Sequence, residues 1–230
     1  MIFARRRGGS PWAVVAVIAV VAAGIAGCWF VGVPRYREAR RVPAPKAYKP
    51  FKAADGSFQC QYPEGWSRAA GEAHAIISAA VFKKGSASIE VTADLLGSLV
   101  GDFTPKGAQG EIDPGTEQLL QAMPEMQAAM KEMKKPAAER LHEAGAKAAA
   151  KRFSGYQEGE MKTMVGQAGD GRYSEFTADG GWLDGKLRGY RVTIMGPQRA
   201  LTVICRCPES EWKTLKPAFE RVVNSLQPGT

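Results

Sequence analysis

The sequence predicts an α+β domain in which helices sandwich an antiparallel sheet, preceded by one N-terminal transmembrane helix. Three observations lead to this fold class: a long uncharged run near the N-terminus, short strand-like segments separated by turns, and a closing stretch with apolar residues at helical spacing. Of the 230 residues, 45% are hydrophobic and 23% are charged. These values are close to the average of globular proteins and exclude fibrous and wholly disordered classes.

The uncharged run covers residues 11–33 and carries Trp12 and Trp29 near its two ends. A helix of this length rises about 34 Å, which is enough to cross a hydrocarbon core of roughly 30 Å. A basic tail, residues 1–10 with Arg5-Arg6-Arg7, comes before it. We therefore expect a signal-anchor that keeps the chain in the bilayer as a single-pass membrane protein.

The end of this run also permits other interpretations. Ile25-Ala26-Gly27-Cys28 resembles a bacterial lipobox, in which Cys28 would be lipidated, and a cleaved signal peptide has a similar layout. The apolar run continues through Trp29 to Val33, where lipoproteins usually become polar. This continuation favours the uncleaved anchor, with the other two interpretations left as alternatives.

A basic, proline-rich linker is predicted over residues 34–53, because four prolines and no apolar periodicity argue against a packed element. Its arginines are candidates for contact with anionic headgroups: Arg35, Arg37, Arg40 and Arg41. The net charge of +8 lies entirely in residues 1–49, since residues 50–230 contain 22 basic and 22 acidic residues. We therefore expect no nucleic-acid partner.

Two opposing arguments bear on the orientation of the chain. Three Lys or Arg residues precede the run and six come after it, so a positive-inside count places the C-terminal domain in the cytoplasm. That orientation requires export of a tail with three adjacent arginines, whereas a charged tail before an apolar run is the usual layout for export of the C-terminal part of a chain. We expect an extracytoplasmic domain at the cell membrane.

The domain is predicted over residues 54–230, with a Met-rich helical insertion at about 113–153. Its predicted strands are 56–63, 75–82, 87–94, 172–178, 186–195 and 199–207. In the last of these, Leu201, Val203, Cys205 and Cys207 share one face. An amphipathic helix is predicted over 209–226, and its apolar stripe contains Trp212, Leu215, Phe219, Val222 and Leu226.

Two motifs within this series of predicted strands and helices resemble those of PsbP-like proteins, a superfamily named after an extrinsic subunit of photosystem II. They are Phe58-x-x-x-Tyr62-Pro63-x-Gly65-Trp66 and, after Glu211-Trp212, Phe219-x-x-Val222-x-x-Ser225-Leu226. The resemblance covers roughly residues 54–228. It implies an antiparallel sheet covered by helices in a small binding or assembly module. The anchor and the Met-rich region depart from the plant pattern, so no calcium, chloride or photosystem-binding role is carried over.

The polar residues of the sequence form no recognised motif for catalysis or metal binding. His74 and His142 stand in no metal-ligand pattern, and no phosphate-binding loop or nucleophile elbow occurs. Several carboxylates accompany the C-terminal strands, but the sequence does not bring any two of them together: Glu158, Glu160, Glu175 and Asp184. We expect no catalytic residue, no metal ligand and no cofactor.

The cysteines Cys60, Cys205 and Cys207 leave two interpretations open. They are either small buried hydrophobic residues, or Cys60 forms one disulfide with Cys205 or with Cys207. The function we expect is a membrane-tethered, non-enzymatic binding or assembly module with an unknown protein partner. The alternatives are a ligand-binding accessory protein and a thiol-based redox protein that uses these three residues.

Overall fold

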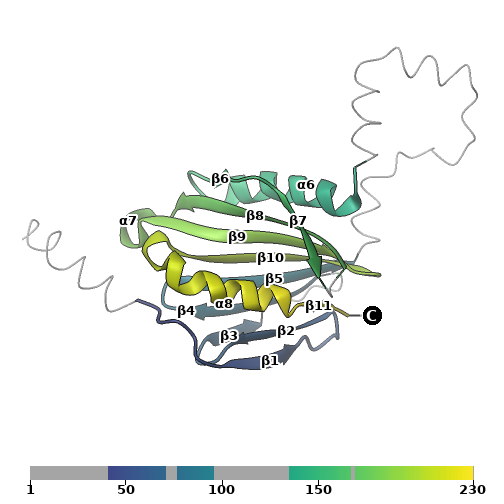
Figure 1. The fold of residues 1–230 in the computed structure, drawn as a ribbon, viewed down its shortest axis with the longest axis horizontal. Coiled ribbons are helices and arrows are strands. Elements are labelled where there is room, and N and C mark those ends of the chain that lie inside the picture. The colour runs from purple at the N-terminus through teal and green to yellow at the C-terminus, as the bar shows by residue number, and fades with distance from the viewer. Residues whose placement is uncertain (1–40, 71–76, 96–134, 167–168, 230) are drawn as a thin grey trace, which may run out of the picture. The chain divides into compact units, whose positions relative to one another are not determined.

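The structure, a computed structural model, describes residues 41–70, 77–95, 135–166 and 169–229, and its strands form two antiparallel sheets (Figure 1). The larger sheet has the order β3-β4-β5-β10-β9-β8-β6, with β7 also beside β8. Its strands are β3 (Ser67–Ala70), β4 (Ile77–Lys84), β5 (Ala87–Leu95), β6 (Gln157–Glu158), β7 (Lys162–Gly166), β8 (Gly169–Asp179), β9 (Lys186–Met195) and β10 (Arg199–Pro208). The smaller sheet has the order β1-β2-β11, with strands β1 (Tyr48–Lys52), β2 (Phe58–Pro63) and β11 (Gln227–Pro228).

The predicted α+β class is confirmed for the described residues, and the predicted strands appear within three residues of their expected ends. The consecutive strands β8, β9 and β10 pair as an antiparallel meander, as their short connections predicted. One connection contains the short helix α7 (Gly181–Asp184). Apolar alternation in 199–207 identified β10, whereas β9 is buried on both faces because α6 and α8 cover opposite sides of the sheet.

The predicted membrane span at 11–33 lies outside the described residues. The same is true of Cys28, His74 and the Met-rich first part of the helical insertion. In the part of the chain that the structure does describe, no helix combines the length and the apolar character needed to cross a bilayer.

The prediction that residues 34–53 lack any packed element was wrong. Val42 is buried, and β1 pairs with β2 along its whole length. The ring of Phe51 lies 5.6 Å from the ring of Phe58 and 5.3 Å from that of Phe82. Pro50 concealed this strand, but β1 is paired only with β2 among the described strands, and a proline is tolerated at such a sheet edge.

The main core lies between the larger sheet and the helix α8 (Trp212–Asn224), which follows the short 3-10 helix η2 (Glu209–Glu211). The predicted apolar stripe of this helix is buried as expected, in one cluster with Leu201 and Val203 of β10. Phe219 is fully buried, and its ring contacts the indoles of Trp66 and Trp212 at centroid distances of 6.4 and 6.1 Å. Burial of this stripe fixes α8 on the sheet.

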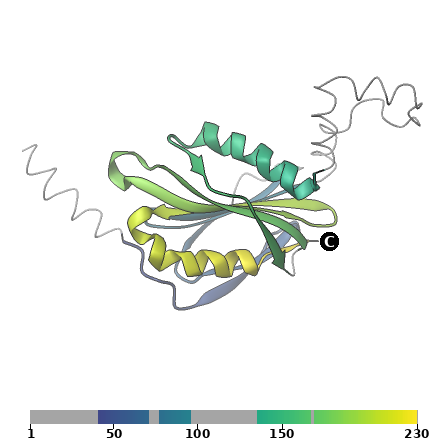
Figure 2. The same ribbon diagram turned by 45° about the horizontal axis from the view of Figure 1, so that its top comes forward.

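The helix α6 (Ala137–Arg152) covers the opposite face of the larger sheet, against β8 and β9 (Figure 2). Its many alanines favour a helix, and Pro136 directly before it is compatible with a helix start. Lys151 and Arg152 in its last turn interact favourably with the C-terminal end of the helix dipole. The residues of α6 that face the sheet recur at spacings of 4, 3 and 4: Ala138, His142, Gly145 and Ala149. This stripe contains no large apolar side chain, so α6 approaches the sheet closely.

We predict that Phe219→Ala lowers the free energy of unfolding by about 3–5 kcal/mol, because it empties a fully buried ring site between two indoles. The matched control is Lys213→Ala on the exposed side of the same helix, which should change stability by less than about 0.5 kcal/mol. Urea denaturation of the two variants measures both values. Small and equal effects would show that α8 is not docked on the sheet.

Candidate functional site

The edge strand beside β8 contains a β-bulge. Glu158 of β6 pairs with Phe176, whereas Lys162 of β7 pairs with Tyr173, so three residues of the edge strand stand opposite two of β8. The N–H of Gly159 donates to the carbonyl oxygen of Glu175 at 2.8 Å within this bulge. Because side chains alternate along a strand, one extra residue reverses the faces of the residues after it. The bulge therefore places the side chain of Glu158 in β6 on one face of the sheet and those of Lys162 and Met164 in β7 on the other.

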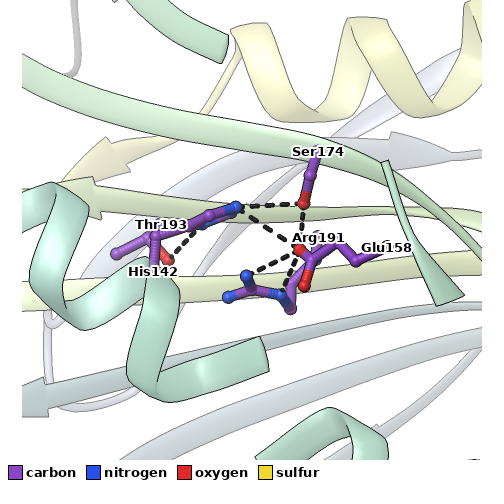
Figure 3. A network of polar contacts seen from close by, with 5 residues as sticks. All are labelled: His142, Glu158, Ser174, Arg191 and Thr193. Atoms are coloured by element: carbon purple, nitrogen blue, oxygen red, sulfur yellow. Dashed lines mark hydrogen bonds and ion pairs between the residues drawn. The ribbon is translucent and has the colours of Figure 1, made fainter. Parts of the chain in front are cut away.

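On the α6 face, the bulge places Glu158 against the guanidinium of Arg191 (Figure 3). Oε1 of Glu158 accepts hydrogen bonds from Nε and Nη2 of Arg191 at 2.9 and 2.6 Å, and also from the hydroxyl of Ser174. Arg191 is 1% exposed, and the Glu158 side chain is 14% exposed. A buried guanidinium requires an anion of this kind, because removal of either partner would leave a charge without solvation.

Gly145 of α6 provides the space for Arg191. A Cβ atom at position 145 would lie 2.7 Å from Nη1 of Arg191, which is too close for van der Waals contact. This Nη1 is buried and has no hydrogen-bond partner among the described residues. A glycine within a helix lowers the stability of the helix by about 1 kcal/mol relative to alanine. Here the glycine allows the helix to approach the guanidinium of Arg191 closely.

His142 extends the same network, and its hydrogen bonds fix its tautomer. Its Nε2 lies 3.0 Å from the hydroxyl oxygen of Ser174, and its Nδ1 lies 3.0 Å from that of Thr193. The Ser174 hydroxyl donates its proton to Glu158, so its oxygen accepts from His142. Nε2 therefore carries the hydrogen, and Nδ1 accepts from the hydroxyl of Thr193.

The surroundings of His142 keep its ring neutral. Burial lowers the pKa of His142 to about 4, and the charge of Arg191 adds to this effect, while Glu158 acts in the opposite direction. The pair of Ser174 and His142 does not have the geometry of an activated nucleophile, because the serine proton points to Glu158 and not to the imidazole. Both residues are also buried, at 1% and 2% exposure. The network joins α6 to the sheet.

On the other face, β7 forms one wall of a groove whose second wall is α8. The groove has a volume of about 660 Å³, and its floor includes Tyr173 and Tyr190. Glu175 accepts hydrogen bonds from Nη2 of Arg188 at 2.7 Å and from Nζ of Lys216 at 3.1 Å. The hydroxyl of Tyr190 donates to Glu220 at 2.9 Å. The groove thus combines aromatic surface with charges of both signs.

Neither Glu175 nor Tyr190 in the groove is prepared for proton transfer at neutral pH. Partial burial acts to raise the pKa of Glu175, but the hydrogen bonds from Arg188 and Lys216 lower it overall. Burial raises the pKa of Tyr190, and the neighbouring Glu220 raises it further. Glu175 therefore stays ionised and Tyr190 stays protonated, whereas a general acid or base needs a pKa near the working pH.

A second hollow, of about 780 Å³, lies on the other side of α8 against β1 and β2. Side chains bridge its two sides: Nε of Arg221 lies 3.4 Å from the amide oxygen of Gln61, and the hydroxyl of Ser225 accepts from the N–H of Gln61 at 2.8 Å. The guanidinium of Arg221 also stacks over the ring of Tyr48 at 4.2 Å. The polar groups that line this second hollow thus bond largely to one another.

The three candidate cysteines are free thiols and are buried in the core on the α8 side. Burial raises the pKa of Cys60 to about 12 and that of Cys207 to about 12, and it also raises the pKa of Cys205. A reactive cysteine needs the opposite shift and access to solvent. The structure therefore supports the interpretation as buried hydrophobic residues, and neither pairing of Cys60 is present in it.

The carboxylates singled out in the sequence are dispersed. Glu158 belongs to the network under α6, Glu175 and Glu160 line the groove, and Asp184 accepts from the hydroxyl of Ser86 at 2.6 Å. Among the described residues, no group of three or more His, Cys, Asp or Glu side chains is placed to hold a metal ion. Sequence reasoning missed the groove and the role of Arg191, for which Gly159 in the edge strand and Gly145 in the helix were the available signals.

Comparison with solved structures shows proteins of similar arrangement. The cyanobacterial PsbP (CyanoP) of Synechocystis sp. PCC 6803 matches with a TM-score of 0.48 and 11% identity, over 81% of this chain and 94% of that chain. LpqN of Mycobacterium tuberculosis, involved in cell envelope biogenesis, matches with a TM-score of 0.42 and 13% identity, over 80% of this chain and 91% of that chain.

A protein of unknown function from Pseudomonas aeruginosa, PA94, matches with a TM-score of 0.40 and 12% identity, over 80% of this chain and 99% of that chain. A PsbP protein is among these similar structures. At these identities the likeness concerns the fold alone. No family model and no curated protein matches the sequence.

We predict that the stability of the domain depends on pH through His142. The unfolded chain binds this proton with a pKa near 6.5 and the folded protein with a pKa of about 4, so stability is complete above pH 6.5 and falls as the pH drops toward 4. Between pH 7.5 and 5.0 the free energy of unfolding should fall by about 2 kcal/mol more in the wild type than in His142→Gln. Urea titrations at both pH values measure this difference, and an identical pH dependence of the two proteins would contradict it.

Proposed function

We propose that residues 42–229 form a non-enzymatic binding module that uses the groove between β7 and α8 to hold a protein partner. The observation that carries this proposal is the lining of the groove, where aromatic rings lie beside side chains that carry charges of both signs. Binding sites typically combine such apolar surface with a few placed polar groups, and volumes of 300–1,000 Å³ are usual.

The reactive side-chain types support binding in preference to catalysis. His142 and Ser174 are enclosed beneath α6, and the cysteines are buried in the core on the α8 side, where Cys60 borders the second hollow. None of them lines the groove. The thiol-based redox alternative is therefore the weaker one, because it would need at least one of these thiols to reach solvent as a thiolate.

The proposal includes a tether at the membrane, with the domain outside the cytoplasm. The uncharged run at 11–33 is long enough for one span, and the arginines at 5–7 favour retention of the N-terminal tail on the cytoplasmic side. A basic segment after the span would lie near the headgroups, where each cation contributes about 1 kcal/mol. A module tethered by this segment would meet partners at the membrane surface.

Site-specific photo-crosslinking in cells of the source organism tests the binding surface. A p-benzoylphenylalanine at Thr163, exposed on β7, should give one discrete protein adduct after irradiation. The matched control is the same residue at Lys147, exposed on α6, which should give no such adduct. No adduct from Thr163, or the same adduct from both positions, would overturn the assignment of the groove as the binding surface.

A further inference from the structure

We propose that the partner binds as an extended peptide segment that adds a strand to the edge of β7 that no described strand pairs, with alternate side chains directed into the groove. This inference rests on the proposed function, because it names the form in which the groove holds its partner. It concerns the main-chain N–H and C=O groups of β7, whereas the proposed function rests on the side chains that line the groove.

The edge of β7, and not one of its faces, borders the groove. Three successive residues of this strand line the cavity: Lys162, Thr163 and Met164. Side chains alternate between the two faces of a strand, so a cavity that contacted only one face would be lined by every second residue. In Figures 1 and 2, β7 leaves the edge of the sheet and crosses in front of it toward the C-terminal end of α8. Its open side therefore borders the space between strand and helix.

That open side offers main-chain hydrogen-bonding groups. Among the described strands β7 pairs only with β8, and in the described part of the chain no other backbone hydrogen bond involves residues 160–166. An edge with unpaired N–H and C=O groups is a template for another strand. Five residues of β7 extend about 17 Å, which matches a peptide of about five residues.

The lining fits the side chains of such a peptide better than a lipid or a single anion. Met164, Tyr173 and Val192 offer apolar surface for every second side chain. The rims carry both signs of charge, with Glu160 and Lys162 on the side of β7 and Lys216 and Glu220 on α8. An acyl chain would require an uninterrupted apolar lining, and an anionic headgroup would require positive charge without the carboxylates. Mixed rims suit the polar and charged side chains that alternate with the anchoring ones.

The test uses a phage-displayed library of linear twelve-residue peptides, selected against the full 230-residue chain in detergent. A selected peptide is then synthesised with a single N-methyl group at each backbone position in turn. If it binds as a strand, N-methylation should weaken binding at least tenfold at every second position, because alternate N–H groups face β7. Equal tolerance at all positions would overturn strand addition.

Two variants locate the peptide. Asn224→Trp places an indole at the exposed C-terminal end of α8, within the lining of the groove, and should weaken binding at least tenfold. Lys147→Trp on α6 should leave the affinity unchanged. Binding that is insensitive to Asn224→Trp, or a library that yields no peptide, would also overturn the inference.

A second copy of this chain is the competing occupant of the edge. Self-association of the purified chain that Asn224→Trp abolishes would show that β7 pairs with its counterpart in another molecule, and would overturn the proposal of a peptide from a partner. The proposed function fails separately. A discrete adduct from Thr163 together with peptides that tolerate N-methylation would leave the groove as the binding surface and remove only the strand.

Discussion

The ion pair of Glu158 and Arg191 is the interaction on which the arrangement of the α6 face depends. Arg191 projects from the middle of β9 into a layer that α6 closes, so its charge requires an anion inside that layer. Glu158 reaches it from the edge of the sheet, and Ser174, His142 and Thr193 continue from it in one chain of hydrogen bonds. Gly145 completes the layer, because a larger residue would push the helix away from the guanidinium.

The same ion pair links the two faces of the sheet through the bulge. The edge strand supplies Glu158 to the α6 face. Beyond the extra residue of the bulge, the same strand supplies Met164 to the α8 face. The bulge therefore holds the charge under the helix and also sets the position from which β7 crosses toward α8. Loss of Glu158 from its place would remove the anchor at the start of the groove wall.

Local patterns were sufficient to predict the meander and the closing helix, but not the elements that depend on distant partners. The alternation in 199–207 and the stripe from Trp212 to Leu226 each reflect burial on one side, which is visible within ten to twenty residues. β1 was missed because Pro50 suggests a linker and because its five residues show no alternation of buried and exposed positions. The buried role of Arg191 depends on Glu158, 33 residues before it in the sequence, and on the packing of α6. No local spacing encodes such a contact.

The state of the His142 ring tests this account most directly, because its tautomer depends on the orientation of the Ser174 hydroxyl toward Glu158. Nitrogen-15 NMR of histidine-labelled protein, with the signals assigned through His142→Gln, reports both the tautomer and the charge. The account predicts a neutral ring with hydrogen on Nε2 at pH 5.5, since burial and Arg191 hold the pKa of His142 at about 4. A protonated ring at that pH, or hydrogen on Nδ1, would contradict it. Hydrogen on Nδ1 would mean that Nε2 accepts from the hydroxyl of Ser174, which then does not donate to Glu158.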